Sequence, residues 1–141
     1  MYNHKQIGWV FIISISIVAV ILITLLLTLY SSLLNWIIPV ILLLVFILFH
    51  SLTVAEFDNY IEIRFGPGLI KKKFLFNEIE SCSIARNKWW YGFGIRKIPG
   101  GWLYNVSGLN AIKLNMKNGK EYRIGTDEPQ KLFEVMHKKL S

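Results

Sequence analysis

The sequence predicts an α+β protein: a two-helix transmembrane hairpin, then a small antiparallel β-barrel or strongly bent sheet, capped by a C-terminal helix. Three observations predict it. Residues 6–55 of the 141-residue chain contain no Asp, Glu, Lys or Arg. After that run the apolar residues alternate with polar ones, which is typical of half-buried strands. The last residues form an amphipathic helical pattern.

The uncharged run is too long for one membrane-spanning helix. Fifty helical residues would extend about 75 Å at ~1.5 Å per residue, whereas a hydrocarbon core is ~30 Å thick. Apolarity dips at Tyr30-Ser31-Ser32 and at Asn35-Trp36, so we expect spans over residues 7–30 and 33–52. A signal peptide is disfavoured because its apolar core is usually only about 7–15 residues long. A buried helix pair is disfavoured because only 86 residues remain to cover it.

Two spans place both termini on the same side of the membrane. The connecting segment is uncharged, whereas Lys5 and the other basic residues lie outside the hairpin. Positive charge near span ends is retained in the cytoplasm. We therefore expect a transmembrane hairpin (residues 1–54) and a cytoplasmic domain (residues 55–141), in which the single Cys82 stays reduced.

The domain begins with strand patterns. Residues 60–65 place Ile61, Ile63 and Phe65 on one face, and Gly66-Pro67-Gly68 ends the strand. Residues 69–76 form a second candidate, with Ile70 and Phe74 inward and Lys71 and Lys73 outward, although Lys72 interrupts the alternation. Residues 81–86 form a weaker third candidate.

A β-hairpin over residues 111–125 is the clearest local prediction. A two-residue turn at Asn118-Gly119 would place charged residues on the apolar face. A three-residue loop, residues 117–119, instead pairs Leu114 with Tyr122 and Ile112 with Ile124. We therefore expect the second register, with Gly119 in the left-handed conformation.

A C-terminal helix is expected over residues 127–140. Thr126 can cap it, acids and Pro129 occupy its first turn, and an apolar face follows. Such a helix can cover the open end of a sheet.

The domain resembles a group of small bacterial membrane proteins with a pleckstrin-homology-like (PH-like) domain. The resemblance rests on the segments RFGPGLI, EIESC, WWYGFGIR, GWLYNVSGLNA and IGTDEP, within residues 63–129. It implies an N-terminal hairpin, a PH-like antiparallel barrel with a C-terminal helix, and a location in the bacterial inner membrane. The glycine-rich stretch over residues 97–101 departs from that pattern. Most members have no established activity, and a PH-like fold serves lipid, peptide and protein binding alike.

Basic charge is concentrated between Arg64 and Lys97, where eight basic residues and two acids leave a balance of 8 − 2 = +6. On a membrane-tethered domain such charge is attracted to an anionic inner leaflet or to a phosphorylated headgroup. The plain alternative is a solvated basic face. The candidate lipid or partner contacts are Lys71, Lys72, Lys73, Arg86, Lys88, Trp89, Trp90, Tyr91, Arg96 and Lys97.

Aromatic residues crowd the same stretch. For Trp89, Trp90 and Tyr91, contact with lipid or with the protein's own helices competes evenly with burial, because such rings favour membrane and protein interfaces. For Trp102 and Tyr104 we favour core packing. Nucleic-acid binding is disfavoured because the chain is anchored in a membrane.

Catalytic motifs are not found. The sequence has no dinucleotide fingerprint and no phosphate-binding GxxxxGK[ST] motif, and no residue cluster indicates a metal or cofactor. We therefore expect a non-catalytic module that contacts the anionic membrane surface or a partner protein. The alternative is a structural subunit of a membrane complex, assembled by self-association or with another membrane protein. Small residues spaced along the first span would permit close helix contact: Ser14, Ser16, Ala19 and Thr24.

Overall fold

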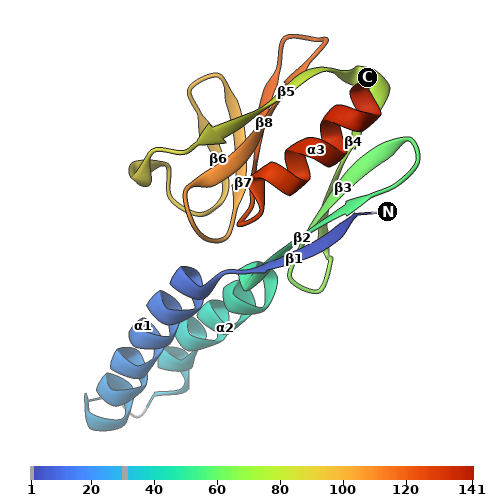
Figure 1. Cartoon of the computed structure of the whole chain (residues 1–141). Helices are drawn as coiled ribbons and strands as arrows, with labels where there is room; N and C mark the ends of the chain where they lie inside the picture. The colour runs from blue at the N-terminus through green and yellow to red at the C-terminus, as the bar shows by residue number, and fades with distance from the viewer. Residues whose placement is uncertain (1, 30–31) are drawn as a thin grey trace.

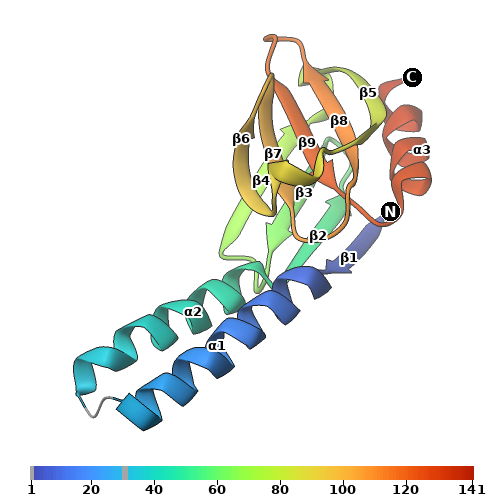
Figure 2. The ribbon, with the colours of Figure 1, turned by 90° about the vertical axis from the view of Figure 1, so that its left-hand side faces the viewer.

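A computed structural model describes residues 2–29 and 32–141. Two helices project from a β-rich domain of two sheets and a third helix (Figures 1 and 2). The coarse α+β prediction is therefore confirmed. Part of the expected break between the spans, at Tyr30 and Ser31, lies outside the described residues.

The projecting helices are α1 (Trp9–Leu29) and α2 (Ile37–Phe49), with the 3₁₀ turn η1 (Leu33–Trp36) before α2. They run side by side in both views, and the Phe11 and Phe49 rings lie 6.1 Å apart (Figures 1 and 2). Among the described helices, only α1 is long and apolar enough to cross a membrane, over Trp9–Thr28.

The predicted spans are too long at their outer ends. Ile7 belongs to a strand, and so do residues 51 and 52. The second predicted span is also not one helix, because it divides into η1 and the thirteen residues of α2. The spans were predicted from the absence of charge. The residues of these strands next to the helices are also uncharged, so the predicted spans included them.

The first sheet has four antiparallel strands in the order β1 (Asn3–Ile7), β2 (Ser51–Glu56), β3 (Tyr60–Phe65) and β4 (Ile70–Leu75). Strand β1 was not predicted. It pairs directly with β2, although both helices separate the two strands in the sequence. The expected boundary between residues 54 and 55 falls inside β2. The alternation of β3 is confirmed, because Ile61, Ile63 and Phe65 are almost fully buried.

The second sheet has the order β5-β8-β9-β7-β6. Its strands are β5 (Ile79–Arg86), β6 (Gly94–Ile98), β7 (Gly101–Asn105), β8 (Asn110–Met116) and β9 (Glu121–Gly125). Strands β7 and β9 are parallel, so the prediction of a wholly antiparallel sheet is wrong at this pair. The described strands form two sheets around one core and do not show a closed barrel.

The predicted β8–β9 hairpin is confirmed in detail. Ile112 pairs with Ile124 and Leu114 with Tyr122. Met116 N–H donates to the Lys120 carbonyl at 2.9 Å, which leaves a three-residue loop, and Gly119 has φ +80°.

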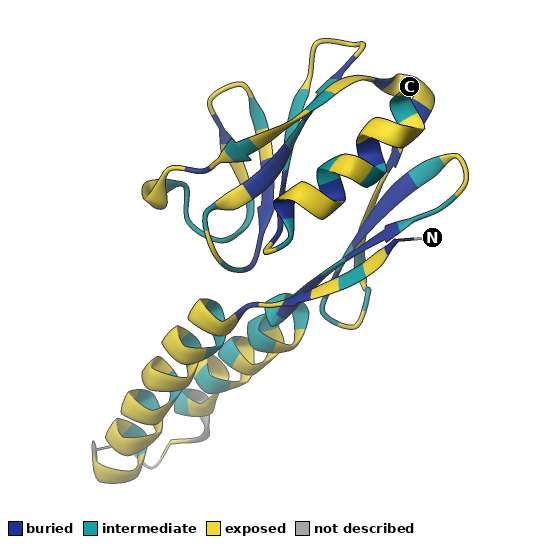
Figure 3. Cartoon of the chain, in the orientation of Figure 1, coloured by how far each residue is buried: buried dark blue, intermediate teal, exposed yellow. Residues whose placement is uncertain are grey.

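Helix α3 (Pro129–Leu140) begins two residues later than predicted, because Thr126 Oγ1 accepts a hydrogen bond from Glu128 N–H at 3.0 Å outside the helix. Leu132 and Met136 are buried, whereas the opposite face is exposed (Figure 3). The helix packs on β5 and β8, and Lys139 pairs with Glu56 of β2 at 3.3 Å. Helix α3 thus joins the two sheets, as the predicted cap requires.

Candidate membrane-contact surface

The end of the domain nearest α1 and α2 is built from close backbone contacts, and we call it the helix-proximal end. Gly8 N–H donates to the His50 carbonyl at 2.8 Å, so the entry to α1 and the exit from α2 are bonded together. A Cβ on Gly66, in the β3–β4 turn, would overlap the Ile47 carbonyl oxygen. A Cβ on Gly8 would lie 3.1 Å from the Val106 carbonyl oxygen. Two turns of the domain therefore touch the ends of the helices.

The lysine triplet of β4 is divided between two faces. Lys71 and Lys73 point to the outer face, where Lys73 Nζ lies 4.6 Å from the centre of the Tyr60 ring and 3.7 Å from Glu62 Oε2. Lys72 takes the opposite face, with Nζ 5.7 Å from the centre of the Tyr122 ring. All three side chains are exposed, yet they do not form one patch. The outward placement of Lys71 and Lys73, with Lys72 on the other face, follows the expected strand alternation.

Lys71 instead belongs to a row that crosses the whole first sheet. Lys5 pairs with Thr53, Thr53 with Arg64, and Arg64 with Lys71. Cross-strand partners share a face, so three cations lie together on the outer face of this sheet. We call Lys5, Arg64 and Lys71 the basic row.

The sequence patterns missed the basic row because β1 was missed. In the structure Asn3, Lys5 and Ile7 are exposed and alternate with the less exposed His4 and Gln6, but the residue types of this segment do not alternate between apolar and polar. The pattern is short and mostly polar, and it resembles an N-terminal tail more than a strand.

Two rows of the sheet lie between the basic row and the helices. Gln6 pairs with Leu52 in the first, and Ile7 pairs with Ser51 in the second, where the Ser51 carbonyl accepts from Gly66 N–H at 2.9 Å. Arg64 Nε is 3.1 Å from Glu62 Oε1, and Glu62 is buried. Beside Lys71, Leu69 is 78% exposed at the tip of the β3–β4 turn.

The aromatic residues form a separate exposed turn. Trp89, Trp90 and Tyr91 make the 3₁₀ turn η3, at the left of Figure 3, and the two indoles are 75% and 59% exposed. The indoles meet edge to face with ring centres 5.8 Å apart. Tyr91 lies over the Arg123 guanidinium at 5.9 Å, which holds the turn against the second sheet. Contact with a partner or with lipid is thus sterically open to both tryptophans.

Two candidate cations accompany this turn. Lys88 Nζ lies 5.1 Å from the centre of the Trp90 ring. Arg96 Nε donates to the Phe93 carbonyl at 2.9 Å.

The other two candidate cations lie elsewhere. Arg86 is exposed at the end of β5, opposite Asn110. Lys97 is exposed one residue from the end of β6 that is farther from the helices, and it pairs with Trp102. Trp102 is 43% exposed, so its expected core role is wrong, whereas Tyr104 is buried as expected.

The titratable groups that are perturbed serve structure. Burial raises the pKa of the Cys82 thiol above its usual range, which keeps the thiol protonated near neutral pH. Burial would also raise the pKa of Glu121, but hydrogen bonds from Lys113 and Arg123 hold it below the usual value. Among the residues that the structure describes, no three His, Cys, Asp or Glu side chains gather where they could hold a metal ion.

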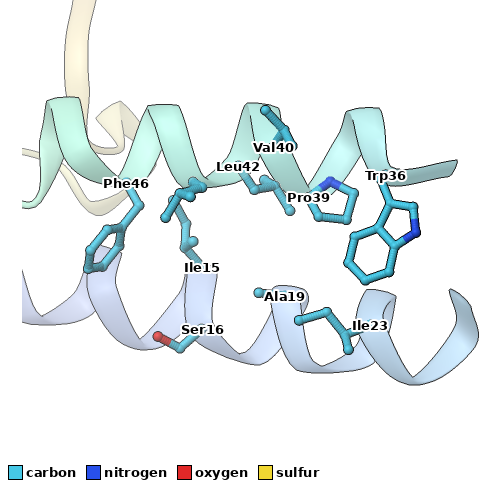
Figure 4. A pocket seen from close by; sticks show the side chains of 10 residues that line it. Ile15, Ser16, Ala19, Ile23, Trp36, Pro39, Val40, Leu42 and Phe46 are labelled. Carbon is cyan, nitrogen blue, oxygen red and sulfur yellow. The ribbon is translucent and has the colours of Figure 1, made fainter. Parts of the chain in front are cut away.

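Two hollows lie away from these candidates. One, of about 460 Å³, is an apolar groove between α1 and α2 with Ser16, Ala19 and Pro39 in its lining (Figure 4). The other, of about 520 Å³, lies by the C-terminal part of α3 and includes Tyr2 and Glu56. Neither contains a residue of the predicted contact set.

Comparison with protein-family models and with curated proteins finds no match to this chain.

Proposed function

We propose that the chain is a non-catalytic, membrane-anchored binding module of the PH-like type. In this proposal α1 and α2 cross the bacterial inner membrane, both termini are cytoplasmic, and the domain contacts the anionic inner leaflet. The observation that carries the proposal is the pair of one-residue junctions. Strand β1 ends at Ile7 and α1 begins at Trp9, while α2 ends at Phe49 and β2 begins at Ser51. The domain is therefore held directly at the ends of the apolar helices.

Helix lengths support a paired crossing. The 21 residues of α1 extend about 31 Å at ~1.5 Å per residue. The four residues of η1 and thirteen of α2 together extend about 28 Å. Both values are close to a hydrocarbon core of ~30 Å. Trp9 and Trp36, at opposite ends of the pair, are exposed as interfacial rings would be.

Charge supports the orientation. The basic row borders the helix-proximal end, whereas residues 32–36 at the far end of the helices are uncharged. Cytoplasmic retention of positive charge then places the domain inside.

A labelling experiment tests the topology. In a Cys82→Ser background, Ser32→Cys places a thiol between the helices and Lys117→Cys places one in the exposed β8–β9 loop. A membrane-impermeant maleimide should label the Ser32→Cys protein in intact cells and the Lys117→Cys protein only after permeabilisation. Protection of both thiols in intact cells would refute the paired crossing, and labelling of Lys117→Cys in intact cells would refute the orientation.

A second function, assembly into a membrane complex, is favoured by the groove between α1 and α2 and by the exposed indoles of η3. Crosslinking of the full-length protein in its native membrane, followed by mass spectrometry, separates the two. One stoichiometric membrane partner would favour assembly, whereas recovery of the protein with lipid alone would favour surface binding.

A further inference from the structure

We propose that the basic row and the Leu69 tip form a docking edge for anionic phospholipid headgroups of the bilayer in which the protein is anchored. This inference rests on the proposed function, because it requires that α1 and α2 span the membrane. It assigns the headgroup contact to Lys5, Arg64 and Lys71, and not to Lys72, Lys97 or the aromatic turn.

Position supports this assignment. Lys5 precedes Trp9 by four residues, and an extended backbone rises ~3.4 Å per residue, so their Cα atoms are at most about 14 Å apart. The long stems of lysine and arginine can carry the charge toward the headgroups. The Lys5 end of the row is therefore tethered within about 14 Å of Trp9, where the proposal places the membrane interface.

The charges in the row are available to a ligand. Among the residues that the structure describes, neither Lys5 nor Lys71 has an ion-pair partner. Arg64 and Lys71 are direct cross-strand partners, and like charges in that relation destabilise a sheet. Within the described residues, Glu62 is the carboxylate paired with Arg64, at 3.1 Å, and it also pairs with Lys73 at 3.7 Å. Local conflicts of this kind are expected at functional sites.

Leu69 adds an apolar contact. The side chain is 78% exposed, and its turn is fixed because Gly66 sits against the last turns of α2. A basic cluster beside an exposed apolar tip supplies two kinds of membrane affinity, charge attraction and interfacial insertion.

The test uses the full-length protein in phosphatidylcholine nanodiscs that contain phosphatidylglycerol. A fluorescent label at Pro67→Cys, an exposed position in the same turn that leaves Leu69 in place, is introduced in a Cys82→Ser background. It is quenched by nitroxide-labelled phosphatidylglycerol or phosphatidylcholine, and the ratio of the two reports anionic lipid enrichment. The row variant carries Lys5→Gln, Arg64→Gln and Lys71→Gln. The control removes equal charge at exposed sites in or near the turns farther from the helices: Lys97→Gln, Lys117→Gln and Lys120→Gln.

Enrichment at position 67 should fall in the row variant and not in the control. At ~1 kcal/mol per basic residue, with one charge offset by Glu62, the loss is up to about thirtyfold at low salt. High salt should produce a similar loss in the parent protein. If Arg64→Gln impairs folding, the double variant Lys5→Gln, Lys71→Gln retains the Glu62 contact and should lose most of the same enrichment.

Equal enrichment in the parent and in the folded row or double variant would overturn the inference, and so would an equal loss in the control. A label at position 67 that no lipid quenches would also overturn it, while Ser32→Cys labelling in intact cells would still support the paired crossing. Failure of that labelling would refute the proposed function itself.

Discussion

Excision of the helices tests whether β1 is part of the domain. Ile7 and Ser51 are cross-strand partners, so a two-residue Asn-Gly turn can replace residues 8–50 and join β1 directly to β2. The product has 141 − 43 + 2 = 100 residues and lacks both apolar helices. We expect it to be soluble and to keep both sheets.

The comparison chain begins at Ser51 and therefore lacks β1. The truncation also removes the preceding residue Tyr2, which is 7% exposed, and with it the hydrogen bond at 2.8 Å from Tyr2 N–H to Glu56 Oε2. Burial of an aromatic side chain contributes ~2 kcal/mol and a hydrogen bond ~1 kcal/mol, so the shorter chain should be about 3 kcal/mol less stable. That loss is a large part of a stability of about 5–15 kcal/mol.

Urea unfolding followed by tryptophan fluorescence measures the difference. With a urea dependence of about 1.5 kcal/mol per molar, the midpoint should fall by about 2 M on loss of β1. Equal midpoints would refute the argument that β1 belongs to the domain. An unfolded 100-residue chain would show instead that the domain requires α2, through Phe49, whose ring centre lies 5.4 Å from that of Phe65.

Three further predictions follow from particular contacts. Gly101→Ala should destabilise the protein by more than about 3 kcal/mol, because its Cβ would overlap the Glu121 backbone, whereas Gly108→Ala, with φ +72° and open space, should cost only about 1 kcal/mol in the same urea assay. Glu121→Gln should be less stable than the parent at neutral pH, and the difference should shrink as the pH falls below 4.5, because a carboxyl with a lowered pKa loses its contribution there. Alkylation of Cys82 should be slow at pH 8 and still rise with pH above 9.0, and a rate that levels off below pH 9 would contradict the raised pKa.

Local patterns were sufficient where one periodicity dominated. The register of β8 and β9 follows from keeping charge off the apolar face, and only one loop length achieves that. The same logic predicted the buried face of β3 and the apolar face of α3.

Long-range pairing could not be read from the sequence. Strand β1 acquires its partner only because two helices bring residues 3–7 back beside residues 51–55. The parallel contact between β7 and β9 likewise depends on the chain crossing over, because β8, which comes between them in the sequence, lies on the other side of β9 in the sheet. No short turn connects either pair of strands, so neither pairing could be predicted from local sequence. For the same reason, the face of the sheet on which Lys5 lies could not be predicted.

The lysine triplet shows why charge counted along a chain overstates a surface. Strand β4 is an edge strand, and lysines on such an edge oppose pairing with another chain. All three lysines can oppose such pairing, whichever face of the sheet they occupy. Only Lys71 also stands in register with Lys5 and Arg64 at the helix-proximal end. The selectivity of the proposed headgroup contact therefore depends on strand register, because a one-residue shift of β4 that placed Ile70 opposite Arg64 would remove a lysine from the row while leaving the net charge unchanged.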